Sequence, residues 1–191
     1  TPLQVAITPL THLAAALANY NISKKSVPVE KAINDVNKRV SDIFTFDITA
    51  TIPKQITDVA NATVALSPEI KYGFISGAIS MWTKENAPSA GTVHVSPFAS
   101  IDLIQTMYDD VLADGLLDGV GLDSANQPIQ LGFGSVSLSA DVYRYQIATK
   151  LITMAKDTNN KTGIPDTGIL SFAQTYGSNA DAIFAGVTTK T

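Results

Sequence analysis

The feature that most constrains the fold is a repeated helix-start signal, a Ser or Thr followed directly by Pro. It occurs at Thr8–Pro9, Ser67–Pro68 and Ser96–Pro97. Ser and Thr side chains accept hydrogen bonds from the unpaired N–H groups of a first helical turn, and Pro has no N–H to leave unpaired there. Each of these pairs therefore predicts that a helix begins at its Pro.

Apolar residues follow these signals at spacings of three and four, which places them on one face of a helix. The clearest amphipathic segment begins at Pro28 and carries Lys31, Lys38 and Arg39 on its polar face. Similar spacing predicts a helix within 139–157 and a short last helix at 164–177. The predicted buried positions are Leu10, Leu13, Ala14 and Leu17; Val29, Ala32, Ile33, Val36, Val40 and Ile43; Ile70, Phe74, Ala78, Ile79 and Trp82; Phe98, Ile101, Ile104, Tyr108 and Val111; and Val142, Tyr145, Ala148, Leu151, Ile152 and Ala155.

The remaining segments are predicted to be connections. Alternating runs around the glycines of 132–135 predict one β-hairpin near 129–138, and Pro53 lies in an extended connector. Gly73 and Gly77 lie inside a predicted helix, which indicates close contact with a neighbouring helix. We therefore predict an all-α fold, a bundle of about six helices with at most one small β-hairpin, in a single domain spanning 1–191.

Composition and charge exclude several functional classes. There is no cysteine, so the chain has no disulfides, thiol nucleophile or zinc–thiolate site. No basic stripe with interleaved aromatic residues is present, which argues against nucleic acid as a partner. No apolar run approaches the length of roughly 20 residues that a membrane span needs. The chain begins at Thr1 without Met or a signal peptide, so we expect a processed piece of a longer protein.

The acidic residues are concentrated in one part of the chain. Between Glu85 and Tyr143 there are eight acidic residues and no Lys or Arg, whereas the rest of the chain carries nine acidic and thirteen basic residues. Asp110, Asp114 and Asp118 follow one another at intervals of four, near a predicted helix end and next to glycines. Like charges at this spacing repel, and anions are unfavourable at a helix C-terminus.

A bound cation would relieve this repulsion. Calcium takes 6–8 oxygen ligands from carboxylates, backbone carbonyls and water. We therefore predict a calcium site formed by Asp110, Asp114 and Asp118, with Asp109 and Asp123 as reserve ligands. The spacing is not that of an EF-hand. The alternative is a solvated acidic turn that Gly115 and Gly119 close, and the sequence leaves both readings open.

No pattern of catalytic residues is evident. His12 lies beside the apolar face of the first helix and His94 lies in a Gly- and Ser-containing loop, so a hydrolase that uses either one is a remote alternative. There is no metal-binding HExxH pair, no nucleophile elbow and no phosphate-binding loop. The aromatic residues could line an apolar pocket for a small ligand or peptide, although core packing is the simpler reading; these are Phe74, Trp82, Phe98 and Tyr108.

Several segments together resemble a helical domain of large exported bacterial surface proteins and lipoproteins, which often follows immunoglobulin-like or other β-modules. They read VAITPLTHLAAALA, NDVNKRVSDIFTFDITATIP, YGFISGAISMW, DGLLDGVG and NKTGI, in this order along nearly the whole chain. The resemblance implies an extracellular or cell-surface location and a role as one module of a longer protein. It implies no activity and no ligand residues.

From these observations we expect a non-catalytic surface module, which serves as a spacer, adhesion or assembly domain and is stabilised by calcium. Its expected partners are neighbouring domains of the same chain or other surface proteins, with no nucleic acid and no membrane span. The alternative is a helical domain that binds a small ligand or a peptide.

Overall fold

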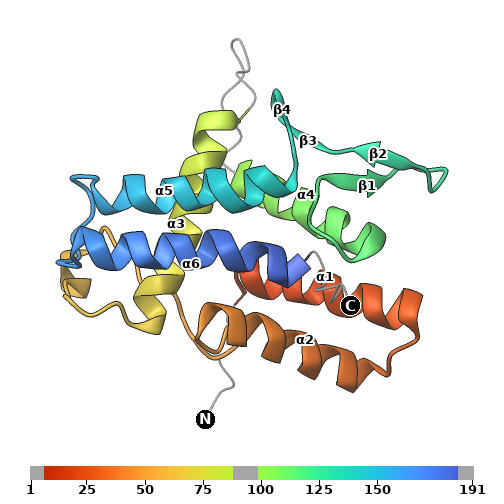
Figure 1. The fold of residues 1–191 in the computed structure, drawn as a ribbon, viewed down its shortest axis with the longest axis horizontal. Coiled ribbons are helices and arrows are strands. Elements are labelled where there is room, and N and C mark those ends of the chain that lie inside the picture. Colours follow the sequence, from red (N-terminus) through yellow and green to blue (C-terminus); the bar gives the residue numbers. More distant parts are fainter. Residues whose placement is uncertain (1–6, 88–98, 185–191) are drawn as a thin grey trace.

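The computed structural model describes residues 7–87 and 99–184, and these form a mostly helical fold with two short strand pairs (Figure 1). The α-helices are α1 (Pro9–Lys25), α2 (Val29–Phe44), α3 (Pro68–Asn86), α4 (Ala99–Asp114), α5 (Ile147–Ala155) and α6 (Asp166–Phe184). A 3₁₀ turn (Val59–Asn61) precedes α3, and a π-helical segment, η2 (Val142–Gln146), leads directly into α5. The predicted helical class is thus confirmed for the described residues.

The helices contact one another in a closed ring. In spatial order the neighbours are α1, α4, α3, α5, α6 and α2, and α2 in turn contacts α1. In Figure 1, α5 and α6 run side by side while α3 crosses them. Each helix therefore has two helical neighbours, and the apolar faces meet inside the ring.

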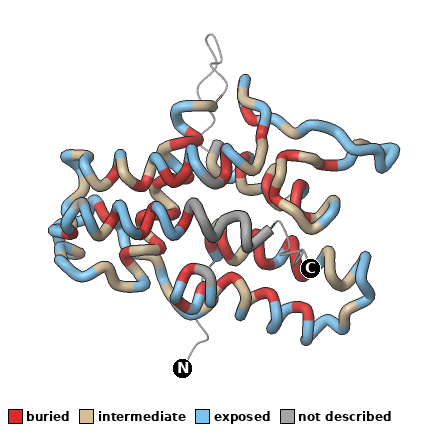
Figure 2. The backbone as a smooth tube through the Cα atoms, viewed as in Figure 1, coloured by how far each residue is buried: buried red, intermediate tan, exposed pale blue. Residues whose placement is uncertain are grey.

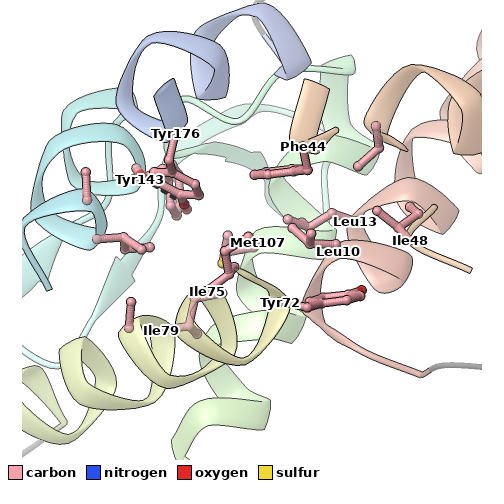
Figure 3. Packing of buried hydrophobic residues seen from close by; sticks show 14 of the residues in the cluster. Leu10, Leu13, Phe44, Ile48, Tyr72, Ile75, Ile79, Met107, Tyr143 and Tyr176 are labelled. Atoms are coloured by element: carbon pink, nitrogen blue, oxygen red, sulfur yellow. Dashed lines mark hydrogen bonds between the residues drawn. The ribbon is translucent and has the colours of Figure 1, made fainter. Parts of the chain in front are cut away.

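The buried residues form one continuous core that all six helices line (Figures 2 and 3). Its largest fully buried side chains include Trp82, Tyr72, Tyr143 and Phe74. Every residue predicted for the inner faces of the segments that became α1 and α3 is buried. Fully burying side chains of this size contributes roughly 1.5–3 kcal/mol each, so these faces are the main source of stability.

Helix α1 begins as predicted. The hydroxyl of Thr8 accepts a hydrogen bond from the N–H of Thr11, and the Thr11 hydroxyl accepts one from the N–H of Thr8. Thr8 also contacts the hydroxyl of Tyr72 on α3. The cap thus joins the start of α1 to the core. The predicted start of α4 at Ser96–Pro97 lies outside the described residues.

Helix α2 buries a narrower face than predicted. Ala32, Val36 and Val40 are buried, but Val29 is 57% exposed and Ile33 is 43% exposed. Helix α2 packs against α1 and α6. Its buried residues lie four positions apart and form one narrow strip, so the apolar residues beside this strip remain at the surface. The helix also begins at Val29, one residue after the predicted Pro28.

The predicted faces of two further helices are correct only in part. On α4, Val111 is buried as predicted, but Ile101 is 62% exposed, and the rest of the buried face consists of Leu103, Met107 and Asp110. In the η2–α5 segment, Tyr145 is 57% exposed and Tyr143 is buried. Val142, Ala148 and Leu151 are buried as predicted, so the departure is confined to the π-helical turn, which contains one residue more than an α-helical turn.

The prediction of at most one hairpin is wrong, because the structure has two antiparallel strand pairs. Strands β3 (Gly132–Phe133) and β4 (Val136–Ser137) pair within the predicted region. Strands β1 (Val120–Leu122) and β2 (Pro128–Gln130) form a second pair that was not predicted. The side chain of Asp123 accepts hydrogen bonds from the N–H groups of Ala125 and Gln127, which closes the connecting loop without an Asn–Gly or Asp–Gly signal.

The two helical glycines of α3 have different neighbours. A Cβ on Gly77 would lie 2.2 Å from the Met154 side chain on α5, which is the predicted close helix contact. A Cβ on Gly73 would lie 2.0 Å from the carbonyl oxygen of Lys54, in the connector rather than on a helix. The last helix, α6, is longer than predicted. Among the described helices, none has both the length and the apolar character needed to cross a membrane.

Candidate functional site

The acidic segment, residues 109–118, covers the C-terminal end of α4 and the turn before β1, at one end of the molecule (Figure 1). Because the buried face of α4 includes Asp110, this carboxyl group enters the core and has no exposed surface. Asp114 is exposed, and Asp118 is half-buried in the turn that follows the helix. The three predicted ligands are therefore in very different environments.

Asp110 links the turn after α4 to the π-helical segment η2. One carboxylate oxygen accepts hydrogen bonds from the N–H of Gly119 at 2.8 Å and from the hydroxyl of Tyr143 at 3.1 Å. The other oxygen is buried without a hydrogen-bond partner. Loss of hydration on burial is the main cause that raises the pKa of Asp110 to about 7, and the charge of Asp118 adds to it, although the hydrogen bonds to this carboxyl act in the opposite direction.

Asp114 and Asp118 each stabilise a turn. A carboxylate oxygen of Asp114 accepts a hydrogen bond from the N–H of Leu116, and one of Asp118 accepts from the N–H of Val120. Burial raises the pKa of Asp114, and the charge of Asp118 adds to this effect. The charge of Asp118 thus acts on both other carboxyl groups.

Two glycines allow the backbone to turn between α4 and β1. Gly115 and Gly119 have φ values of 85° and 89°, a left-handed conformation that residues with a side chain rarely adopt. A Cβ on Gly119 would lie 2.0 Å from the carbonyl oxygen of Leu138. The predicted role of these glycines in turns is confirmed, and Gly119 has the additional role of letting β4 come close.

No group of three or more His, Asp or Glu side chains in the described part of the chain is close enough to enclose a metal ion. Asp110, Asp114 and Asp118 are therefore not assembled as a ready-made set of calcium ligands. The buried oxygen of Asp110 and the spare oxygens of the other two carboxylates could still contribute to a site completed by backbone carbonyls and water. Calcium binding stays a prediction.

Gln130, which no sequence signal marks, connects the two strand pairs. Its side-chain Nε2 group donates hydrogen bonds to the carbonyl oxygens of Gly119, Leu131 and Leu138, at 2.9, 3.1 and 2.7 Å respectively. A Gln at the end of a short strand gives no sequence signal for this role, because two of its acceptors, Gly119 and Leu138, lie in other segments of the chain.

The two reserve aspartates line a surface cleft of about 740 Å³. It lies between the C-terminal part of α1, the C-terminal part of α4, and β1 with its loop. Its apolar residues include Ile22, Leu112 and Leu131, and its charged residues are Lys24, Asp109 and Asp123. Asp109 and Asp123 thus face this cleft, whereas Asp110 lies in the core on another face of α4.

Of the residues named for a catalytic site or an aromatic pocket, His12, Phe74 and Trp82 pack against other side chains. The ring of His12 packs against that of Tyr108, with 4.7 Å between centroids, and His94 lies outside the described residues. Phe74 and Trp82 are buried in the core rather than in a cleft, and Phe98 is also outside the described residues.

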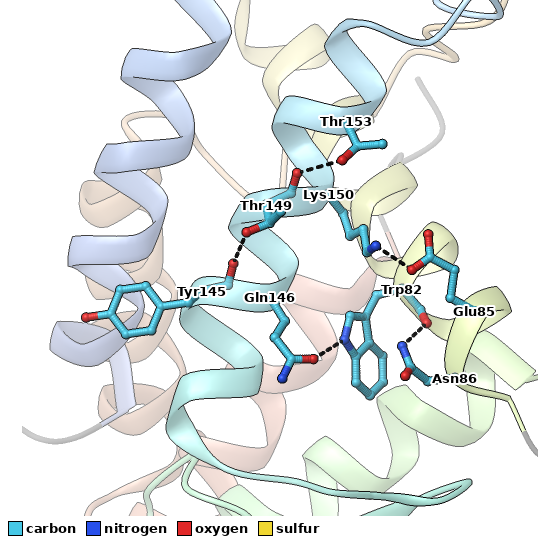
Figure 4. Close-up of polar contacts among 8 residues, drawn as sticks. All are labelled: Trp82, Glu85, Asn86, Tyr145, Gln146, Thr149, Lys150 and Thr153. Atoms are coloured by element: carbon cyan, nitrogen blue, oxygen red, sulfur yellow. Dashed lines mark hydrogen bonds and ion pairs between the residues drawn. The ribbon is translucent and has the colours of Figure 1, made fainter.

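The surroundings of Trp82 show what holds α3 on α5 (Figure 4). The indole N–H donates to the side-chain oxygen of Gln146 at 2.8 Å, and Lys150 forms an ion pair with Glu85. Tyr145 points away from this contact, in agreement with its exposure. These groups are engaged in holding two helices together.

Comparisons with protein-family models, curated proteins and solved structures give no match for this chain.

Proposed function

We propose that this chain is a non-catalytic module of a larger exported bacterial surface protein or lipoprotein, where it acts as a spacer, adhesion or assembly domain. The observation that supports this best is the way the acidic segment is used. Asp110, Asp114 and Asp118 all accept hydrogen bonds from backbone N–H groups of the turns after α4. Polar groups used in this way maintain the shape of a domain, whereas catalytic groups face a substrate.

The location is tested on the full-length gene product, tagged within this domain. On intact cells, we expect the tag to be accessible to an antibody and to added protease. A tag that becomes accessible only after lysis contradicts the surface location. The expected partners are neighbouring domains of the same chain or other surface proteins, which cross-linking on intact cells would identify.

The absence of catalysis is tested separately with the purified domain and chromogenic ester, peptide and glycoside substrates. We expect rates equal to those of the buffer. Turnover that disappears in His12→Ala, while the melting temperature stays the same, contradicts the proposal.

We also propose that the module binds one calcium ion at the acidic segment, through Asp110, Asp114 and Asp118. The support is electrostatic: burial is the main cause of the raised pKa of Asp110 and of Asp114, the charge of Asp118 adds to it, and one oxygen of Asp110 is buried without a partner. A divalent cation would change this repulsion into attraction. Calcium outside cells is commonly near about 1 mM, enough to fill a site with a dissociation constant of about 10⁻⁴ M.

Melting curves with calcium and with a chelator test this site. At ten times the dissociation constant, calcium adds about 1.4 kcal/mol of stability, which corresponds to a melting temperature higher by roughly 3–6 °C. The variant Asp114→Asn with Asp118→Asn keeps the oxygens that accept the backbone hydrogen bonds, and is expected to lose the effect. An unchanged wild-type melting temperature in chelator contradicts calcium binding.

The alternative function, binding of a small ligand or peptide, is favoured by one specific observation, the cleft between α1, α4 and β1.

A further inference from the structure

The cleft between α1, α4 and β1 combines apolar and charged residues in a way that selects a particular kind of ligand. Its volume of about 740 Å³ falls in the range of pockets that bind small molecules and peptide side chains, roughly 300–1,000 Å³. Ile22, Leu112 and Leu131 provide apolar surface. Such surface is suited to an aliphatic chain, because contact with it removes apolar area from water.

Two carboxylates from separate elements face this apolar surface. Asp109 on α4 is oriented by the side-chain amide of Gln105, which donates to one of its oxygens at 2.9 Å. Asp123, directly after β1, is oriented by the N–H groups of Ala125 and Gln127. A carboxylate has about four acceptor positions, so each of these can accept further hydrogen bonds from a ligand.

The opposite wall carries donors. Lys24 and Asn19 lie on the last turns of α1, and both line the cleft. A cationic ligand alone would be repelled by Lys24. A ligand that has carbonyl oxygens as well as a cationic group would pair with both walls.

We infer that this cleft binds a peptide segment through a lysine or arginine side chain. The aliphatic part of that side chain lies on the apolar surface, its charged end is held by Asp109 and Asp123, and carbonyl oxygens of the peptide accept hydrogen bonds from Lys24. This site is distinct from the acidic turn around Asp110. The inference goes beyond the proposed role as a surface module, and each can fail without the other.

Calorimetric titration with two short peptides tests the inference. Acetyl-Leu-Lys-Leu-amide is expected to bind, and acetyl-Leu-Gln-Leu-amide, which lacks the charge, is expected to bind about tenfold or more weakly. Because the pairing is ionic and exposed, affinity for the lysine peptide falls as salt is raised. Equal affinity for the two peptides, or binding of neither, overturns the inference.

Variants localise the binding to the cleft. Asp109→Asn with Asp123→Asn keeps the acceptor oxygen of each side chain, and is expected to lose about tenfold or more of the lysine-peptide affinity. Asp58→Asn is the matched control, because Asp58 also accepts a backbone hydrogen bond in an exposed turn but does not line the cleft. Equal affinity of the double variant and the control overturns the assignment to this cleft.

Spermidine distinguishes a peptide ligand from a free amine, because it has alkylammonium groups but no carbonyls. Lys24→Ala is expected to weaken peptide binding and to strengthen spermidine binding, since it removes a donor and a positive charge together. If wild-type protein binds spermidine more tightly than the lysine peptide, and Lys24→Ala leaves the peptide affinity unchanged, the ligand is not a peptide and the inference is overturned.

Discussion

The replacement Asp110→Asn examines the most unusual group in the structure. Asp110 is fully buried, and the pKa of its carboxyl group is raised to about 7 from an ordinary value of 3.8, chiefly by desolvation. The folded state therefore holds a proton that the unfolded chain releases near pH 4. Between these two values the folded state binds more protons than the unfolded state, so its stability falls as pH rises.

The size of this effect follows from the difference in pKa. One pKa unit corresponds to about 1.4 kcal/mol, so a difference of about 3 units destabilises the fold by about 4 kcal/mol above pH 7. Of this, roughly 2–3 kcal/mol is lost between about pH 5 and pH 8. Asn has a similar shape and keeps an oxygen that can accept from Gly119 and Tyr143, but it does not titrate.

Urea unfolding at a series of pH values is the assay, with a chelator present so that no bound cation holds the carboxylate ionised. We expect wild type to lose stability relative to Asp110→Asn by roughly 2–3 kcal/mol from about pH 5 to pH 8. Near pH 5 the variant is expected to be the less stable by about 1–3 kcal/mol, because its amide N–H groups are buried without an acceptor.

A matched control is available one residue away. Asp109→Asn also removes a carboxylate from α4, but at an exposed position, so it is expected to keep the pH dependence of wild type. If the curves of wild type and Asp110→Asn run parallel across this pH range, the buried carboxyl is ionised throughout, and the reasoning from desolvation is refuted.

Three further replacements test the packing. Val36→Asp is expected to unfold the domain, because it places an unpaired charge in the core at a cost of several kcal/mol. Lys38→Ala on the exposed face is the control and is expected to change stability by about 0.5 kcal/mol or less. Equal melting temperatures of Val36→Asp and wild type would show that Val36 does not lie in the core. Gly73→Ala is expected to lower the free energy of unfolding by about 1–3 kcal/mol in urea melts, because its Cβ would lie 2.0 Å from the backbone carbonyl oxygen of Lys54, and a melting curve like that of wild type would mean that this connector lies further from α3. Gln130→Ala is expected to cost about 1–3 kcal/mol and to raise amide exchange in both strand pairs; exchange that rises only in β1 and β2 would contradict its role as their connection.

The sequence alone was sufficient for the helical class and for the faces of two helices. Both Thr8–Pro9 and Ser67–Pro68 precede a helix that begins at the Pro, and the Thr8 side chain caps its helix, whereas the Ser67 hydroxyl donates to Glu69 instead. The apolar residues behind them recur with the helical period. These signals are local, since a cap and its first turn lie within four residues of each other. The predicted calcium ligands Asp110, Asp114 and Asp118 were likewise selected by local spacing, which groups residues along one helix without showing what faces them.

Tertiary structure decided the rest, because several packed elements determine which side of a helix faces the core. On α4 two apolar faces compete, and contacts with α1 and α3 select the one that contains Leu103 and Met107. This orientation of α4 buries Asp110 beside Tyr143, which is 33 positions away in the sequence. It also directs Asp109 toward the cleft between α1, α4 and β1. The periodicity of apolar residues in the sequence does not encode these contacts, because each contact joins residues that only the closed ring of helices brings together.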